Sequence, residues 1–480
     1  MSPLGYEAMG NLALADVYIV YSSRDPLAAA AAAHLANLLR PQWTIFWDDM
    51  IVGDFVEAIE REMPIAGCVI PIWSPAARTS ESVRDELALA RQHGRTMVPV
   101  RVEACNAPYA YGQLSTVEIQ NWNGGSGHDG FKQLVRKLAS IVPARTPAPR
   151  PSAFGNVTLP SLFFSVSSHE THLKPIEAVR ALRLFGAKTV LISAYDLLPE
   201  RRHKGIVRQL TRLRKQGAVV LVDSGNYEAY RRGDPSWTAD LLRPALEDVP
   251  HDYAFSFDVL QPSRSPAVAA KQIVAAVTRD AMATTKPIIP IVHAPKHDGG
   301  YDLEHLPAII REIADKLGPP MIAIPERELG PGLISSARTV RRIRDALDTL
   351  PFYQPLHLLG TGNPWSIALL AAAGADSFDG LEWCRVVADG LTRKLFHFQQ
   401  FDFFAYQARV ATSPVTAAAM DDDLVDFAGK VAFHNLDVLT KFADELQTGA
   451  ASNRLEALVR ELLGRENAIQ LASQIPDLFK

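Results

Sequence analysis

The chain has 480 residues and a formal net charge of −4, and this length predicts two or three domains rather than a single core. Its hydrophobic share of 48% and charged share of 21% are typical of globular proteins, and no apolar run is long enough to predict a membrane span. The small negative charge argues against broad nonspecific binding of nucleic acids. The three cysteines lack metal or redox spacing and the first residues do not resemble a signal peptide, so we expect a cytoplasmic protein.

A proline-rich run divides the chain. Residues 143–156 contain four prolines and little apolar periodicity, which predicts a semi-extended linker. We therefore expect one domain at residues 1–142, a second at 157–400 and a helical C-terminal subdomain at 401–480.

The first domain alternates short apolar runs with amphipathic ones. Strands are predicted at residues 16–21, 44–49, 68–73 and 97–102, and helices at 26–39, 54–63, 82–94 and 131–142. This alternation predicts an open parallel α/β sheet.

The second domain repeats the alternation eight times. Strands are predicted at residues 161–167, 189–195, 218–225, 253–259, 287–294, 320–326, 355–362 and 375–380. Eight strands separated by helices predict a (β/α)8 barrel, whose chemistry gathers at the carboxyl ends of the strands. Three acids fall there, Asp223, Asp258 and Asp379. They either form a site or, in the plainer interpretation, cap helices.

Four segments of the first domain resemble the TIR (Toll/interleukin-1 receptor) domain, which has a flavodoxin-like fold. They are YIVYSS (18–23), FWDDMIVGDF (46–55), VIPIWSP (69–75) and SESVRDELALA (80–90). Some TIR domains bind adaptors, and others cleave the nicotinamide–ribose bond of NAD with a glutamate in the helix after the third strand. The resemblance implies that Glu86 is this residue, since a carboxylate stabilises an oxocarbenium-like state. By periodicity alone, Glu86 would only solvate a helix face.

The same resemblance implies further contacts with NAD, which would be a substrate and not a cofactor. Ser22, Asp48 and Ser74 end strands that face one cleft, and the loop at 49–55 would cover the nucleotide. Phe55 would either stack on nicotinamide or anchor the helix that follows it.

The second domain resembles the tRNA-guanine transglycosylase family. The resemblance lies in VLVDSGNYEAY (220–230), AFSFDV (254–259), PIVHAPK (290–296), residues 358–380 and FHNLDVLTKF (433–442). It implies that Asp379 is a nucleophile toward the anomeric carbon, that Asp223 transfers the proton of the base and that Asp258 reads the base edge. Such work needs carboxyl groups with different pKa values. An inherited but inactive site is the alternative.

Other positions of this pocket depart from the family. The loop with Gly360 and Gly362 is retained as a binding element, but His293 stands where the family has a glutamine that holds the base. Residues 225–228 and 325–327 also differ from the family pattern. We therefore expect a different base or nucleotide as the ligand.

The stretch FDFFAY, residues 401–406, replaces a metal site of that family. Phe401, Phe403 and Tyr406 stand where the family has three zinc-binding cysteines, and His434 stands where it has the fourth ligand. One imidazole does not make a structural zinc site. We predict that an aromatic cluster replaces the metal, that His434 is a relic or a hydrogen-bonding core residue, and that no metal is bound.

One concentrated basic run occurs at residues 201–216. At helical spacing its cations spread around the helix, so a solvated helix and a nucleic-acid contact both fit.

These features lead to three functional hypotheses. The first is a NAD hydrolase that acts in antiviral defence and is controlled by a barrel that senses a nucleotide, a modified base or a nucleic acid. The second is a base-exchange enzyme on tRNA or DNA with an accessory TIR module. The third is a scaffold in which both sites are inactive. Because both families assemble, we expect a homo-oligomer.

Overall fold

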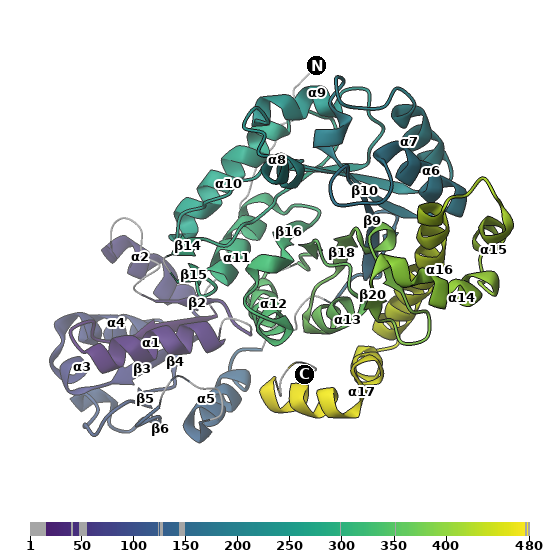
Figure 1. Cartoon of the computed structure of the whole chain (residues 1–480). Coiled ribbons are helices and arrows are strands. Elements are labelled where there is room, and N and C mark those ends of the chain that lie inside the picture. The colour runs from purple at the N-terminus through teal and green to yellow at the C-terminus, as the bar shows by residue number, and fades with distance from the viewer. Residues whose placement is uncertain are drawn as a thin grey trace, which may run out of the picture. The chain divides into compact units, whose positions relative to one another are not determined.

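A computed structural model divides the chain into two compact units, Met1–Ala148 and Pro149–Lys480 (Figure 1). The structure describes residues 16–39, 42–47, 55–122, 124, 128–143, 149–297, 299–350, 352–475 and 478, apart from the side chains of residues 37, 55 and 57. No helix among these residues is long and apolar enough to cross a membrane.

The first unit is built on a parallel sheet with the strand order β2-β1-β3-β5-β6, and β4 also pairs with β3. Its strands are β1 (Val17–Val20), β2 (Ile45–Phe46), β3 (Cys68–Trp73), β4 (Thr96–Met97), β5 (Val100–Arg101) and β6 (Val117–Glu118). Its helices are α1 (Pro26–Leu39), α2 (Phe55–Glu62), α3 (Pro75–Thr79), α4 (Glu81–Gln92) and α5 (Asp129–Ala139). The flavodoxin-like fold expected for this domain is thus confirmed.

Two details of this sheet differ from the predicted elements. The strand predicted at 97–102 is divided into β4 and β5, and Pro99, which lacks a backbone donor, lies between the two parts. The short strand β6 was not predicted, since it has only two residues. Both faces of the sheet are covered by separate apolar clusters, one around Leu35 and Leu134 and the other around Trp73 and Leu87.

The second unit is an eight-stranded parallel barrel with the order β13-β12-β11-β10-β9-β18-β17-β16. The strands are β9 (Ser161–Val166), β10 (Thr189–Ser193), β11 (Val219–Asp223), β12 (Tyr253–Phe255), β13 (Ile288–Ile289), β16 (Ile322–Pro325), β17 (Leu356–Leu359) and β18 (Ser377–Gly380). A parallel bridge between Ile291 and Ala323 joins the last open edge. All eight predicted strands are present, and the barrel prediction is confirmed.

The inside of the barrel is packed with apolar side chains below its carboxyl end. Phe163, Leu221, Phe255 and Ile289 belong to this inner cluster, together with Val157 from the hairpin of β7 (Ala153–Phe154) and β8 (Val157–Thr158). The barrel is therefore a filled core and not a pore, and only its carboxyl end is left open to a ligand.

Helices surround the barrel, as Figure 1 shows. They are α6 (Pro175–Phe185), α7 (Ile206–Lys215), α8 (Asn226–Arg232), α9 (Leu242–Leu246), α10 (Pro266–Asp280), α11 (Leu306–Leu317), α12 (Leu333–Leu347) and α13 (Pro364–Ala373). Between β11 and α8, Gly225 has φ +81°, and a Cβ there would lie 2.6 Å from the Tyr195 nitrogen. Glycine is required at this turn, and it sets the position of α8 at the mouth of the barrel.

The C-terminal helices α14 (Ala405–Arg409), α15 (Pro414–Asp421), α16 (Phe427–Ala451) and α17 (Leu455–Gln474) follow the barrel. Helix α13 is apolar on all sides because it lies beneath α16 and α17 as well as beside the barrel. The predicted C-terminal helices are confirmed.

The predicted aromatic replacement of the zinc site is only partly correct. Phe401 is 3% exposed and lies against Phe427 and His434, whereas Phe403 and Tyr406 are 76% and 59% exposed. Phe403 ends the 3-10 helix Phe398–Phe403, which buries Phe398 and Phe401, and Tyr406 lies on the short helix α14, which buries Ala408 instead. These side chains offer no donor set for zinc.

His434 is a hydrogen-bonding core residue. Its Nε2 lies 2.7 Å from the Ala388 carbonyl oxygen, and the neighbouring Asn435 amide donates to the carbonyls of Trp383 and Val386. Burial lowers the pKa of His434 below its usual value. Among the described residues, no group of three or more His, Cys, Asp or Glu side chains could hold a metal ion.

Candidate functional site

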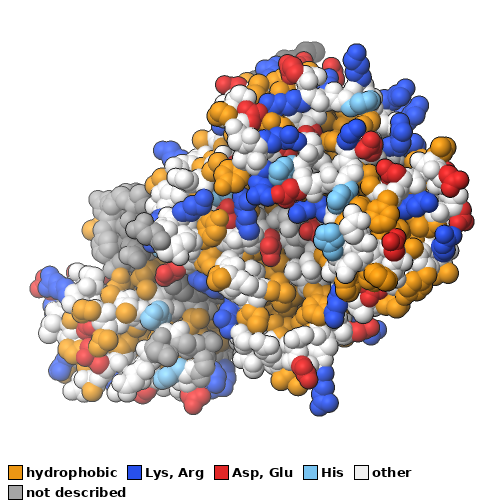
Figure 2. Space-filling view, in the orientation of Figure 1, with side chains coloured by type: hydrophobic (Ala, Val, Ile, Leu, Met, Phe, Trp, Pro, Cys, Tyr) orange, Lys and Arg blue, Asp and Glu red, His pale blue; other side chains and the backbone are white. Residues whose placement is uncertain are grey.

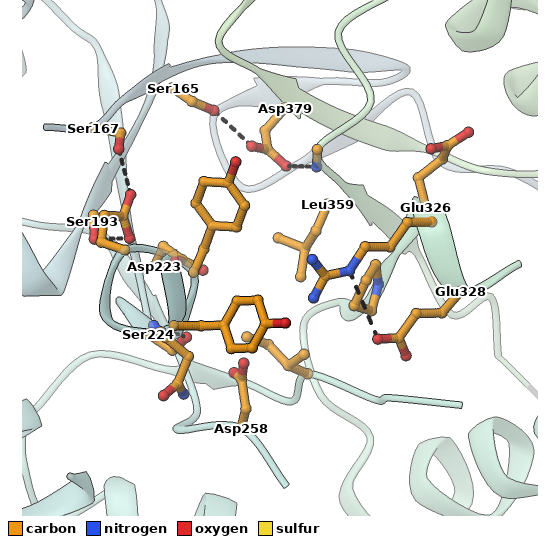
Figure 3. Close-up of a pocket in the computed structure, with 18 of the residues that line it drawn as sticks. Ser165, Ser167, Ser193, Asp223, Ser224, Asp258, Glu326, Glu328, Leu359 and Asp379 are labelled. Carbon is orange, nitrogen blue, oxygen red and sulfur yellow. Dashed lines mark hydrogen bonds and ion pairs between the residues drawn. The ribbon is translucent and has the colours of Figure 1, made fainter. Parts of the chain in front are cut away.

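The carboxyl end of the barrel holds a cavity of about 600 Å³, shown in Figure 3. The carboxyl groups that line it are those of Asp223, Glu228, Asp258, Glu326, Glu328, Asp379 and Glu382. The three predicted barrel acids are therefore brought together, and four further acids join them. An interior with this many acceptors favours a ligand rich in N–H donors.

Asp379 lies at the end of β18, is 6% exposed and is held by three donors. Its Oδ2 accepts a hydrogen bond from the Ser165 hydroxyl at 2.6 Å, and its Oδ1 accepts one from the Gly360 N–H at 2.9 Å. The His357 Nε2 is 3.2 Å from Oδ1. Figure 3 shows the contact with Ser165. The carboxylate is thus fixed in orientation at the wall of the cavity.

The ring of His357 belongs to a chain of hydrogen bonds inside the barrel. Its Nδ1 is 2.8 Å from the Ser377 hydroxyl, which lies 2.8 Å from the Ser161 hydroxyl. With Ser377 donating to Nδ1, Nε2 carries the proton and donates to Asp379. Neither His357 nor Ser165 was predicted, although both occupy inward positions of predicted strands.

Asp223 ends β11 and faces acids rather than cations. Burial and the charges of Glu228, Asp258 and Asp379 raise the pKa of Asp223 well above its usual value. Glu228, on the first turn of α8, accepts hydrogen bonds from the hydroxyls of Ser167 and Ser193, both at 2.6 Å. An acid whose pKa is raised by its surroundings can hold and release a proton, which is what acid–base chemistry needs.

His293 joins Asp258 to Glu328. Its Nε2 is 3.2 Å from Asp258 Oδ2 and its Nδ1 is 2.9 Å from Glu328 Oε1, while Glu328 Oε2 accepts from the Ala294 N–H at 2.9 Å. Burial lowers the pKa of His293, but the two carboxylates outweigh it and raise the pKa to about 9. Within the described part of the chain, Asp258 Oδ1 has no hydrogen-bond partner, so it is available to a ligand.

The glycine loop is shaped around another acid. A Cβ at either Gly362 or Gly380 would overlap the Glu382 carboxyl, so only glycine admits this side chain. Burial raises the pKa of Glu382 and also that of Glu326 on the opposite loop. Neither glutamate was predicted as a site residue. Glu326 directly follows β16 and Glu382 lies two residues after β18, and each begins a 3-10 helix that sets the direction of its side chain.

In the first unit, Ser22 and Ser74 follow neighbouring strands at the point where the strand order reverses. Ser22 follows β1 and Ser74 follows β3, and they are 4% and 1% exposed. The two strands are neighbours at the centre of the sheet, and ligands of open α/β sheets bind outside the carboxyl ends at such a point.

Glu86 is 5% exposed, so the interpretation as a solvated helix residue is wrong. It lies on the face of α4 that also carries Val83, Leu87 and Ala90, and this face packs against Tyr18 of β1 and Trp73 of β3. Helical spacing thus places Glu86 on the face of α4 that packs against β1 and β3, the strands that Ser22 and Ser74 follow.

Asp25, an acid that was not predicted, interacts with Ser74 and with a second such acid, Glu103. Asp25 caps α1, with its Oδ1 accepting from the N–H groups of Leu27 and Ala28 at 3.0 and 3.2 Å. Burial raises the pKa of Asp25, but hydrogen bonds from Ser74, the backbone and Glu103 outweigh it and lower the pKa.

Asp48, the loop at 49–54 and the side chain of Phe55 lie outside the described residues, so these predictions stay predictions.

The basic run at 201–216 is partly used in structural contacts. Arg201 pairs with Asp234 at 2.8 Å and its guanidinium lies 3.9 Å from the centre of the Tyr195 ring. Arg214 pairs with Asp252. These contacts favour a structural role for much of this run.

Comparisons with known proteins agree with the two folds. Residues 17–135 match the family model of the TIR domain. The chain is 23% identical over 311 residues to a tRNA-guanine(15) transglycosylase of Haloferax volcanii, which covers 60% of this chain and 57% of that protein. It is 22% identical over 291 residues to the enzyme of the same name from Methanothermobacter thermautotrophicus, covering 58% of this chain and 43% of that one.

The fold and the comparisons define a TIR domain joined to a barrel that is similar to transglycosylases. The chain spans about half the length of the curated relatives that it matches.

Proposed function

We propose that the first unit cleaves the nicotinamide–ribose bond of NAD and that Glu86 is its catalytic carboxylate. The burial of this acid against the central strands carries the proposal. As nicotinamide leaves, positive charge develops on the ribose, and a fixed carboxylate in a site of low polarity stabilises it. Ser22 and Ser74 would orient the nucleotide at the strand ends.

In this proposal the barrel controls the first unit. Its acid-lined cavity would bind a nucleotide, a modified base or a nucleic acid, and binding would trigger NAD loss as a defence response. Assembly into a homo-oligomer would complete the active form. The support for a ligand-binding role is the cavity itself, in which Asp258 Oδ1 has no partner among the described residues.

The test is release of nicotinamide from NAD by the full chain, with guanine nucleotides and tRNA supplied as candidate triggers. Glu86→Gln is expected to reduce the rate on the order of 10²–10³-fold, because it removes the charge and keeps the shape. Glu81→Gln is the matched control, since Glu81 lies on the same helix with its side chain 90% exposed. Turnover that survives Glu86→Gln contradicts the proposal.

Base exchange on a nucleic acid is the second candidate function. It is favoured by one observation, the ionisable pair of Asp379 and Asp223 on one cavity, with the pKa of Asp223 raised. Asp379 would attack the anomeric carbon as the N-glycosidic bond to the base breaks. Asp223 would give a proton to the departing base and take one from the incoming base, which displaces Asp379 from the ribose. Incorporation of labelled guanine into tRNA that Asp379→Asn abolishes and Glu86→Gln does not would support this candidate.

A further inference from the structure

The mouth of the barrel cavity carries a cluster of cations around one exposed acid, Glu170. Tyr227 and Arg231 come from α8, Arg385 follows the 3-10 helix Glu382–Cys384, and Glu170 lies in the loop after β9. Tyr227 and Arg385 also line the cavity, so the cluster borders it directly. Figure 2 shows Lys, Arg, Asp and Glu side chains together around the hollow on the visible face of this unit.

Glu170 accepts hydrogen bonds from three donors, Tyr227, Arg231 and Arg385. Its Oε2 is 3.2 Å from the Tyr227 hydroxyl and 3.3 Å from Arg385 Nη2. Its Oε1 accepts from Arg231 Nη2 and lies 3.3 Å from His169 Nε2, which itself accepts a hydrogen bond from Arg231 Nε. The hydrogen bond from Arg231 is the main reason that the pKa of Glu170 lies below its usual value, so the group is an anion at neutral pH.

We propose that the three donors Tyr227, Arg231 and Arg385 form a phosphate subsite, that the Glu170 carboxylate occupies it in the absence of ligand, and that a phosphate group replaces this carboxylate on binding. This inference deepens the ligand-binding role proposed for the barrel and rests on it. Guanidinium groups bind phosphate and carboxylate with the same two-pronged geometry, so one donor set accepts either anion.

Two observations favour an exchangeable anion over a purely structural ion pair. The side chains of Glu170, Arg231 and Arg385 are 32%, 42% and 36% exposed, and ion pairs this accessible contribute little to stability. Glu170 also has φ +53°, a left-handed conformation that glutamate seldom adopts. The loop thus holds the carboxylate over the cavity mouth at a conformational cost.

The charge pattern identifies the class of ligand. The acids that line the cavity can accept hydrogen bonds from N–H groups, and the arginines and Tyr227 at its mouth can donate to an anion. A nucleotide has both features, with a donor-bearing base and a phosphate about one ribose away. A free nucleotide and one residue of a nucleic-acid strand share this chemistry.

The test is calorimetric binding to the full chain with inorganic phosphate, guanosine, GMP and a short single-stranded RNA as probes. Glu170→Gln is expected to bind phosphate and GMP about tenfold more tightly than the unmodified chain, because the competing anion is removed, and to bind guanosine unchanged. Arg231→Gln and Arg385→Gln should each lower the affinity for GMP about tenfold without changing the affinity for guanosine. Where the affinity for GMP rises, a still larger rise for RNA would identify a strand as the source of the phosphate, and a smaller rise for RNA would identify a free nucleotide.

The control is Glu312→Gln, which removes an ion pair with Lys316 on α11, where the glutamate side chain is 33% exposed. It should leave every affinity unchanged. Phosphate and GMP affinities that Glu170→Gln leaves equal or makes weaker overturn the proposal. Because the measurement is binding and not NAD turnover, its failure is distinct from a failure of the proposed activity. The substituted side chains are all partly exposed, and a thermal unfolding curve for each variant verifies that it is folded.

Discussion

The two ends of strand β18 carry the same residue type for opposite purposes. Asp376, just before the strand, is 0% exposed and is fully compensated by Arg150 at 2.8 Å, Arg344 at 2.9 Å and the Tyr353 hydroxyl at 2.6 Å. Asp379, three residues later, is held by a hydroxyl, an amide and an imidazole, and no Arg or Lys contacts it in the described part of the chain. The paired acid closes the bottom of the barrel, whereas the acid without a cation is left to interact with a ligand.

The largest expected effect is a difference in the free energy of unfolding between substitutions of these two aspartates. Asp376→Ala leaves the buried Arg344 and the partly buried Arg150 without their anion, which should lower the free energy of unfolding by about 3–5 kcal/mol. Asp379→Asn keeps the shape and the three donors nearby, and it should cost less than about 1.5 kcal/mol while abolishing any base exchange. Urea denaturation followed by tryptophan fluorescence measures both.

Asp345→Ala is the control for this experiment. It removes an exposed i,i+4 pair with Arg341 on α12, so it should change stability by less than about 1 kcal/mol. Equal losses for Asp376→Ala and Asp379→Asn would contradict the division of roles between the two ends of β18.

The pH dependence of stability sharpens the same contrast. The pKa of His293 is raised from about 6.5 to about 9 in the folded chain, so folding is stabilised fully below pH 6.5 and this stabilisation is lost as the pH rises through 9. The loss is on the order of 3 kcal/mol at most, since each pKa unit corresponds to about 1.4 kcal/mol. Urea denaturation between pH 6 and pH 9.5 measures it.

His293→Gln should lower stability at pH 6 and flatten the curve over this range. The variant has the glutamine that the family carries, so it also keeps a hydrogen-bonding side chain between Asp258 and Glu328. A curve as steep as that of the unmodified chain would mean that another group causes the pH dependence. Tyr353→Phe, at the opposite end of the barrel, should leave the slope unchanged.

The strands and the three aspartates were predictable because their signals are local. Each barrel strand is a short apolar run ended by polar residues, and parallel strands place their carboxyl ends together, so Asp223, Asp258 and Asp379 had to converge. The burial of Glu86 follows in the same way from the apolar face of α4. Local sequence therefore predicts which acids reach a common edge.

The partners of these acids were not predictable, because loops and distant strands supply them. Glu228 reaches the cavity only because Gly225 turns the chain into α8, and Glu382 only because two glycines leave space for it. Phe403 and Tyr406 failed as core residues since a 3-10 helix that ends at Phe403 buries Phe398 and Phe401, and the separate helix α14 buries Ala408 and leaves Tyr406 exposed. Such directions depend on packing between segments far apart in the sequence.

The smallest expected effect is the loss in free energy of unfolding when a single hydroxyl group is removed. Two hydroxyl groups each donate at 2.6 Å to an aspartate at one end of β18. Tyr353→Phe removes the donor to Asp376. Because that carboxylate is 0% exposed, water cannot replace the lost hydroxyl, so the free energy of unfolding should fall by about 1–3 kcal/mol. Ser165→Ala removes the donor to Asp379. Because Asp379 faces a cavity of about 600 Å³, water can replace the lost hydroxyl, so the free energy of unfolding should fall by less than about 1 kcal/mol. Urea denaturation of both variants at pH 7 gives the two values. A cost for Ser165→Ala that equals or exceeds that of Tyr353→Phe would mean that the cavity end of β18 is as closed to solvent as the other.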